Sequence, residues 1–424
     1  MAAIRTFLSG ADVVLPDRVA SGLTLVLEGD RIVDLTSGPR QLSSQETRVD
    51  VTGRLLVPGF IDVHVHGLLG VDVLDGPEAV MAVARQLPQF GVTAFCPTSV
   101  ACSNETLGVF LAAVAAARVA AEPGAARVLP AHLESSFINP EFRGAQPLEW
   151  LCTYKANPEG ESRTQGDGCD FHRVGPIEAT LWKSDPSPYC AKPGDVSLTP
   201  DVGILTIAPE IPGGMDLLRD AIAAGIRVSL GHSGATFDQG IEAIQAGARH
   251  ATHLFNRMSP MSHRDPGLVG AVLASEDIAA EIICDGFHVH PAVLRVAIAA
   301  KGHSRMMAIT DGTSGSGLPA GACARLGGRT ITVSPRRDSA RLADGTLAGS
   351  VATMDQVFAI LVTRAGQSLV EAATLCSTTP AREMGLTGQG VIAPGSLADL
   401  AVLTPGLRVV QTWVGGRTSG PQRP

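Results

Sequence analysis

The stretch FIDVHVHG, residues 60–67, is an apolar run that ends in two histidines. A short apolar run of this kind is typical of a buried strand. His64 and His66 stand two positions apart, so on a strand both side chains point to the same face. Two imidazoles on one inner face have few purely structural explanations, so this strand predicts a functional site as well as a core element.

Seven similar runs follow along the chain, and helical patterns such as ETLGVFLAAVAAARVAA separate most of them. The seven runs are residues 92–97, 126–134, 203–210, 226–232, 250–255, 278–285 and 305–311. Together with the first run they make eight strand-like segments. Strands and helices that alternate eight times predict an α/β fold, a TIM-like (β/α)8 barrel.

Polar residues in these runs lie at or near the strand ends. The runs end in or carry His64, His66, Glu134, His232 and His253. In a (β/α)8 barrel the C-terminal strand ends form the active-site face. A buried carboxylate such as Glu134 costs several kcal/mol to desolvate unless a cation meets it. The set therefore predicts a divalent metal with nitrogen and oxygen ligands, which suits Zn, Fe, Co, Mn or Ni.

Asp311 ends the eighth run and is the natural general base. A metal lowers the pKa of a bound water toward ~7, and a carboxylate beside that water can accept and return its proton. The structural alternative is a helix N-cap, because DGTSG begins at this residue. The seventh run reaches Asp285 and is followed by His288, which adds polar groups to the same face.

Composition narrows the class of protein. The chain has 424 residues, of which 45% are hydrophobic and 17% are charged, and its net charge is −8. Such a chain buries a large core. It shows no basic patch and no apolar stretch of about 18 residues, so neither nucleic acid nor a membrane is expected as a partner. Eight irregularly spaced cysteines and an N-terminus without a signal-peptide pattern favour a cytoplasmic location.

The two ends of the chain differ from the middle. Residues 1–57 and 390–424 show short strand-like runs with turns, such as the turn at Pro405–Gly406. We therefore predict a small β-sandwich domain formed by both chain termini, with the barrel at 58–389. The barrel has an extended loop at 148–200, rich in Gly, Pro and Asp, which could act as a lid. Cysteines and a histidine near this loop match no standard zinc spacing: Cys152, Cys169, His172 and Cys190.

With these residues placed, the chain resembles the amidohydrolase superfamily, and within it the N-acetylglucosamine-6-phosphate deacetylases. The resemblance covers nearly the whole chain. Its motifs are PGFIDVHVHG (58–67), HLE (132–134), TIAPE (206–210), GHSGAT (231–236), ATHLFNRMSP (251–260), HRDPGLVGA (263–271), CDGFHVHP (284–291), ITDGT (309–313) and LADGTLAGS (342–350). It implies hydrolysis of the N-acetyl group of N-acetylglucosamine 6-phosphate, which gives glucosamine 6-phosphate and acetate.

The resemblance also implies a cofactor and an assembly. One or two divalent ions, most often zinc, are expected, and homodimers are common in the family. The principal metal would be held by Glu134, His232 and His253. His64 and His66 match members that carry a second metal, and Asp311 would be the acid–base and a further ligand candidate. The phosphorylated amino sugar would be gripped by Asn256, the backbone at Arg257, Arg264 and His288.

The chain departs from the family around the acyl group. It reads HLESS, with Ser135 and Ser136, where the family reads HLEGP. Gln146 stands 12 residues after Glu134, where the family usually has a histidine that donates to the substrate carbonyl. The Gln146 amide can still donate one hydrogen bond but cannot become cationic, so it stays a candidate catalytic and substrate-binding residue. Arg257 also replaces a small residue, which places a bulky cation near the expected phosphate.

Three hypotheses follow. The first is the deacetylase itself. The second is an amidohydrolase that acts on a different N-acyl amino sugar or another N-acyl substrate, because fold does not fix substrate. The third, which is less favoured, is a non-catalytic barrel protein; such proteins usually lose ligands or the base, and this chain keeps both.

Overall fold

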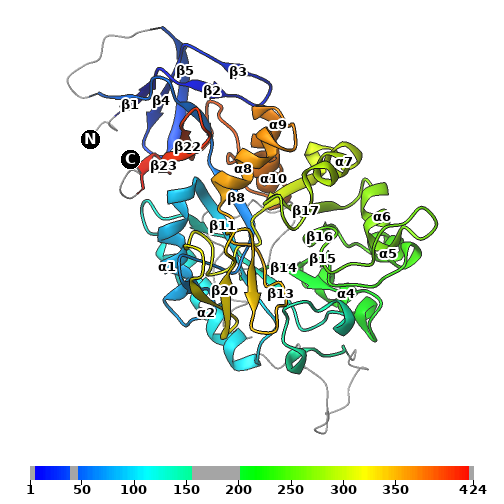
Figure 1. The fold of residues 1–424 in the computed structure, drawn as a ribbon. Coiled ribbons are helices and arrows are strands. Elements are labelled where there is room, and N and C mark those ends of the chain that lie inside the picture. Colours follow the sequence, from blue (N-terminus) through cyan, green and yellow to red (C-terminus); the bar gives the residue numbers. More distant parts are fainter. Residues whose placement is uncertain (1–4, 39–45, 155–200, 420–424) are drawn as a thin grey trace.

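The computed structural model describes residues 5–38, 46–154 and 201–419 (Figure 1). Its centre is a nearly closed parallel barrel, and all eight predicted runs contribute strands. These strands are β8 (Phe60–Val65), β11 (Val92–Ser99), β13 (Ala131–Glu134), β14 (Val202–Ile207), β15 (Arg227–Leu230), β16 (His250–Ala251), β17 (Ala279–Ile283) and β18 (Met306–Ile309). The prediction of a (β/α)8 barrel is confirmed.

Parallel pairing runs around the barrel from β8 through β11 and β13 to β18. The circle closes where Val65, at the end of β8, forms a parallel bridge with Gly312, just after β18. The third predicted run is interrupted. It forms β13 and a separate strand, β12 (Arg127–Val128), on either side of Leu129 and Pro130. Proline has no N–H to donate to a ladder, which explains a break at this point.

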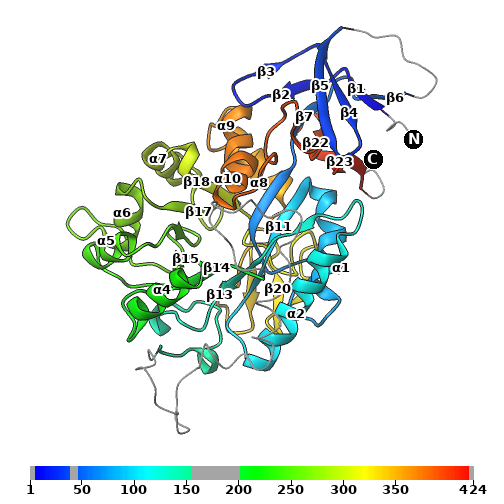
Figure 2. The same cartoon turned by 180° about the vertical axis from the view of Figure 1, so that it is seen from behind.

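Helices surround the barrel, as the two opposite views in Figures 1 and 2 show. They are α1 (Ala79–Gln86), α2 (Asn104–Ala120), α4 (Gly214–Ala223), α5 (Phe237–Gln245), α6 (Gly267–Ala274), α7 (Pro291–Lys301), α8 (Met354–Thr363), α9 (Leu369–Ala373) and α10 (Thr379–Glu383). Local chemistry sets where some of them begin: Thr236 and Gln239 form a capping box at α5, and proline opens α7.

The main core lies between strands and helices. A smaller apolar cluster lies inside the barrel, where alternate residues of several strands meet α10. Its members include Ile61, Cys96, Ile204, Met307 and Met384. This packed floor means that the barrel is not a pore, and the polar residues at the strand ends lie beyond it.

The two ends of the chain build a small domain of two sheets. One sheet contains β1 (Arg5–Ser9), β4 (Leu23–Glu28), β5 (Arg31–Ser37) and β6 (Thr47–Asp50). The other contains β2 (Asp12–Val14), β3 (Val19–Ala20), β7 (Leu55–Pro58), β22 (Leu400–Leu403), β23 (Val409–Val414) and β24 (Arg417–Thr418). An apolar cluster that includes Leu25, Leu56 and Trp413 joins them. Because β7 pairs with β22, both termini share one sheet, while the boundaries 1–57, 58–389 and 390–424 stay a prediction.

A three-stranded antiparallel sheet between β18 and α8 was missed from the sequence. It consists of β19 (Cys323–Leu326), β20 (Arg329–Val333) and β21 (Ala340–Leu342). Gly327–Gly328 joins its first two strands, and burial alternates along them, which is the pattern of a hairpin. Two short strands, β9 (Gly67–Leu68) and β10 (Val71–Asp72), pair just after β8.

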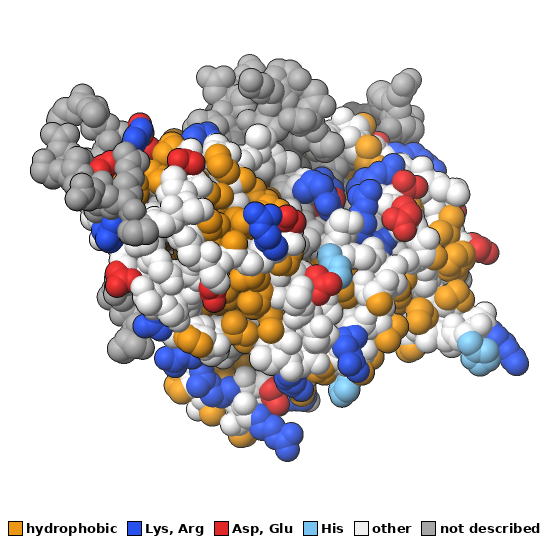
Figure 3. Space-filling view, turned by 90° about the horizontal axis from the view of Figure 1, so that it is seen from above, with side chains coloured by type: hydrophobic (Ala, Val, Ile, Leu, Met, Phe, Trp, Pro, Cys, Tyr) orange, Lys and Arg blue, Asp and Glu red, His pale blue; other side chains and the backbone are white. Residues whose placement is uncertain are grey.

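Most of the predicted loop at 148–200, with Cys169, His172 and Cys190, lies outside the described residues. None of the described helices has the length and apolar character that a membrane crossing requires. On the face shown in Figure 3, Lys and Arg side chains lie interspersed with Asp, Glu and apolar side chains.

Candidate active site

Three buried side chains from the ends of three barrel strands converge on one point. Glu134 ends β13, His232 follows β15 and His253 follows β16. Oε1 of Glu134 lies 2.8 Å from Nε2 of His232 and 2.8 Å from Nε2 of His253. The two Nε2 atoms are 3.0 Å apart. We call Glu134, His232 and His253 the principal ligand set.

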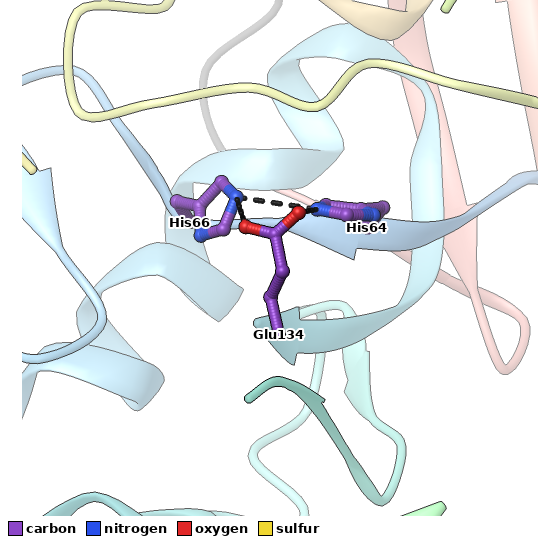
Figure 4. A group of neighbouring side chains, drawn as sticks. All are labelled: His64, His66 and Glu134. Atoms are coloured by element: carbon purple, nitrogen blue, oxygen red, sulfur yellow. Dashed lines mark hydrogen bonds and ion pairs between the residues drawn. The ribbon is translucent and has the colours of Figure 1, made fainter. Parts of the chain in front are cut away.

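The paired histidines, His64 and His66, face the same carboxylate from β8 and the residue that follows it (Figure 4). Their Nε2 atoms are 3.2 Å apart. Nε2 of His64 lies 3.8 Å from Oε1 of Glu134, and Nε2 of His66 lies 3.6 Å from Oε2. Glu134 therefore sits between two groups of imidazoles, and both groups have the spacing of a metal site.

Hydrogen bonds on the far side of the rings test whether these groups fit a cation. Nδ1 of His66 lies 3.0 Å from the carbonyl of Thr98, and Nδ1 of His232 lies 2.8 Å from the carbonyl of Phe142. A carbonyl only accepts, so Nδ1 carries the proton and Nε2 of the neutral ring presents a lone pair. Lone pairs that face one another and a carboxylate need a positive ion between them. The residues fit a divalent metal.

Asp311 lies just after β18 and reaches the paired histidines. Its Oδ1 is 3.3 Å from Nε2 of His64 and 3.2 Å from Nε2 of His66. The next described helix, α8, has Thr353 at its N-cap, so the alternative of a helix cap at Asp311 is wrong. The backbone of Asp311 has φ +50°, and His232 and His253 also have positive φ. Such strain in non-glycine residues concentrates at functional sites.

The charges at this centre favour ionised carboxylates. Burial raises the pKa of Glu134, but His232 and His253 outweigh it and hold the pKa well below its ordinary range. Burial also raises the pKa of Asp311, and a hydrogen bond from His66 outweighs it, so this pKa is lowered as well. In the metal-free centre, burial lowers the pKa of His66, but Asp311 and Glu134 dominate and raise it to about 9. His66 then carries a second proton on Nε2, and a bound cation would take the place of that proton. Two buried carboxylates among imidazoles attract a cation.

Gln146 is buried beside Glu134. Its Nε2 donates to Oε2 of Glu134, and its Oε1 accepts from the backbone N–H of Ala101 at 2.7 Å. The sequence-based hypothesis assigns this amide to a substrate carbonyl. In the structure the amide holds Glu134, so any contact between Gln146 and a substrate stays a prediction.

A pocket of about 500 Å³ opens over the centre. His66, Glu134, Gln146, His232, His253 and Asp311 line it, together with Asn256, Arg257 and His288. Arg264 is exposed and is not among the lining residues, so the structure does not place it with the other predicted phosphate contacts. Val100, Ile283, Leu326 and Leu347 supply an apolar part of the wall.

The predicted substrate residues differ in how firmly they are held. His288 Nδ1 lies 2.6 Å from Oδ2 of Asp285. Burial lowers the pKa of His288, but this hydrogen bond outweighs it, and the pKa is raised. Nδ2 of Asn256 donates to the carbonyl of His253 at 3.3 Å. Arg257 is exposed, and its side chain passes so close to Gly144 that a Cβ there would lie 2.4 Å from its Nε.

Sequence reasoning missed Glu281. This side chain lies inside the barrel in the middle of β17, and Oε2 is 2.9 Å from Nδ1 of His64. The predicted site residues lie at strand ends, whereas Glu281 is flanked by Ala279–Ala280 and Ile282–Ile283. A glutamate inside such an apolar run is costly without a partner, and that signal was available in the sequence. Leu326 and Leu347 were missed for a different reason: the sheet that carries Leu326 was not predicted.

Comparison with known proteins places the chain in one family. The Amidohydrolase family model matches residues 55–419. The N-acetylglucosamine-6-phosphate deacetylase of Bacillus subtilis is 30% identical over 93% of this chain and 91% of its own length. The mouse enzyme of the same name is 35% identical over 94% and 93%. The N-acetylgalactosamine-6-phosphate deacetylase of Escherichia coli O157:H7 is 31% identical over 87% and 89%.

Solved structures agree with this placement. The N-acetylglucosamine-6-phosphate deacetylase of Pasteurella multocida superposes with a TM-score of 0.81 at 27% identity, over 98% of this chain and 99% of that chain. A mutant of the Mycobacterium smegmatis enzyme, solved in complex with N-acetyl-D-glucosamine-6-phosphate, has the same score at 28% identity and the same coverage. The resemblance found in the sequence is confirmed, and the chain belongs to the Amidohydrolase family.

Proposed function

We propose that this chain removes the N-acetyl group of N-acetylglucosamine 6-phosphate by hydrolysis, giving glucosamine 6-phosphate and acetate. The observation that carries the proposal is the meeting of Asp311 with five potential metal ligands, four of which line the same pocket as Asp311. The extended match to deacetylases, up to 35% identity over nearly the whole chain, supports the choice of substrate. Members of the Amidohydrolase family are generally dependent on divalent metals, and the enzyme is a carbon–nitrogen hydrolase.

The principal ligand set would hold one divalent ion, and the paired histidines with Glu134 would hold another. Zinc is our choice, because imidazole and carboxylate suit it in a site that keeps a position open. A bound divalent ion supplies Lewis acidity and lowers the pKa of water toward ~7.

The protein's own residues then divide the remaining work. Asp311, an ionised carboxylate at the pocket floor, takes the proton of the attacking water and delivers it to the leaving nitrogen. His288, which Asp285 makes more basic, offers a positive charge to the phosphate. Arg257 adds a second positive charge at the wall of the same pocket. Gln146 keeps Glu134 in place.

A second substrate is favoured by one observation. The relative from Escherichia coli O157:H7 is named for N-acetylgalactosamine 6-phosphate and is 31% identical. That sugar differs from N-acetylglucosamine 6-phosphate only in the configuration at one hydroxyl-bearing carbon. The two sugars carry the same acyl group and the same phosphate, which are the parts that the proposed site would bind.

Acetate release by the metal-replete protein tests the proposal, with Asp311→Asn as the blank. We expect turnover of N-acetylglucosamine 6-phosphate well above the blank, and much weaker turnover of unphosphorylated N-acetylglucosamine. N-acetylgalactosamine 6-phosphate belongs in the same panel. A metal-loaded protein that hydrolyses neither phosphorylated sugar would refute the proposal and favour another N-acyl substrate. Absence of turnover with every N-acyl substrate, despite bound metal, would favour a non-catalytic barrel.

A cytoplasmic location and a homodimer stay predictions. All six described cysteines are free thiols, which supports a reducing compartment. Light scattering on the purified protein would determine its oligomeric state.

A further inference from the structure

Glu281 is a buried carboxylate beneath the metal centre, and nothing in the proposed reaction uses it. Its side chain is fully buried inside the barrel. Imidazoles meet it from three other strands, and two of them form hydrogen bonds, while Nδ1 of the third, His132, lies 3.6 Å from Oε1. Oε2 lies 2.9 Å from Nδ1 of His64, and Oε1 lies 2.9 Å from Nε2 of His250. The backbone N–H of His253 points at Oε2 over 3.3 Å.

The contact with His64 decides which nitrogen of that ring is free. An ionised carboxylate only accepts hydrogen bonds, so Nδ1 of His64 carries the proton and donates it to Glu281. The neutral ring then presents a bare Nε2 toward His66 and Asp311. A carboxylate behind a ligating imidazole fixes its tautomer and orientation and raises its basicity.

Glu281, His64 and His132 also have the spacing of a separate metal site, but their hydrogen bonds speak against it. Nδ1 of His132 lies 3.1 Å from the carbonyl of Val63, so that nitrogen carries a proton. Its Nε2 lies 2.8 Å from Oγ1 of Thr206. His132 therefore has no lone pair directed at Glu281, and the cluster is a support for the centre above it.

We propose that Glu281 is a positioning residue that makes His64 competent to bind the second metal ion. Through the N–H of His253 it also links His64 to the principal ligand set. The inference rests on the metal centre of the proposed function but not on the identity of the substrate. Metal binding measured without substrate therefore separates failure of this inference from failure of the deacetylase proposal.

The test is Glu281→Gln, which keeps the shape and removes the charge. The glutamine can accept from one ring only, and its NH₂ group must face the other. If the NH₂ group faces His64, the tautomer reverses and Nε2 is blocked; if it faces His250, His64 loses the carboxylate that raises its basicity. We expect the second zinc ion to bind about 10- to 100-fold more weakly, with the first ion retained.

Zinc per chain, measured by elemental analysis during titration with a chelator, is the readout. His250→Gln is the matched control, because it removes the other imidazole that is hydrogen-bonded to Glu281 and leaves the contact with His64 intact. We expect this control to bind two ions as the parent does. Two ions at parental affinity in Glu281→Gln would overturn the inference, and so would a parent protein that binds only one.

A double-mutant cycle protects the test against misfolding. In a His64→Asn background, Glu281→Gln should not weaken zinc binding further, because the ring on which it acts is gone. A further loss of the first ion there would assign Glu281 to general support of the barrel and overturn the inference. Should Glu281→Gln fail to fold, Glu281→Asp keeps the charge but withdraws it from His64, and we expect the same selective loss of the second ion.

Discussion

The side-chain amide of Gln146 donates a hydrogen bond to Oε2 of Glu134, while Oε1 of the same carboxylate faces His232 and His253. The two oxygens of one ligand are thus used differently. The other end of the Gln146 amide accepts from the N–H of Ala101. Gln146 is therefore a clamp between the loop after β11 and a proposed metal ligand, whereas the resemblance led us to expect a donor to the substrate at this position.

Gln146→Leu should lower the free energy of unfolding by about 1–3 kcal/mol, because the buried N–H of Ala101 loses its acceptor. Urea denaturation of the metal-free protein measures this change. Gln389→Leu is a matched control, since Gln389 is also buried and its Oε1 has no hydrogen-bond partner among the described residues. An equal loss of unfolding free energy in both variants would contradict the role of Gln146 as a clamp.

Asp311→Asn should lower kcat by about 10²–10⁴, because the amide cannot accept the proton of the attacking water. KM should change little, and the zinc content should be kept if Asp311 serves as the base. Steady-state kinetics and elemental analysis check the two parts. Asp265→Asn, on an exposed loop, controls for the loss of a negative charge. Loss of zinc together with activity would make Asp311 chiefly a ligand.

The affinity for a phosphorylated substrate should depend on pH through His288. Asp285 raises the pKa of His288, so the cation is present below this raised pKa and is lost as the pH rises through it. Asp285→Asn removes the partner and should move this loss of affinity to lower pH. The measurement is KM for N-acetylglucosamine 6-phosphate in both proteins at several pH values around neutrality. Ionisation of the substrate affects both proteins equally, so it cancels in the ratio of the two KM values. Identical pH profiles would exclude a cationic His288 from phosphate binding.

Removal of the metal should destabilise the protein. A ligand that binds only the folded state stabilises it by about 2.7 kcal/mol at a free concentration of 100 times Kd. Chelation should therefore lower the Tm, and zinc should restore it. The three ligand atoms of the principal ligand set lie 2.8–3.0 Å from one another, so without metal only protons on the rings can offset their mutual repulsion. A Tm that does not respond to chelator or zinc would argue against a metal at this centre.

The sequence by itself determined the barrel and the outline of the site. Each strand is a local apolar run, and where a histidine or carboxylate stands at its end, as in most of the runs, that residue is visible without knowledge of its partner. Since parallel strands bring their carboxyl ends to one face, the meeting of Glu134, His232, His253 and Asp311 followed from the fold class alone. The sandwich of both termini followed from the contrast between the ends of the chain and its middle.

Only the tertiary structure decided which polar groups share a contact. His64 and Glu281 are 217 positions apart, and no local pattern relates them. The same holds for the bond between Gln146 and Glu134 and for the absence of Arg264 from the pocket wall. Backbone periodicity and burial are properties of a few neighbouring residues, so a sequence displays them. The partner of a buried polar group depends on how distant segments pack, to within fractions of an ångström, and that is settled only when the whole barrel closes.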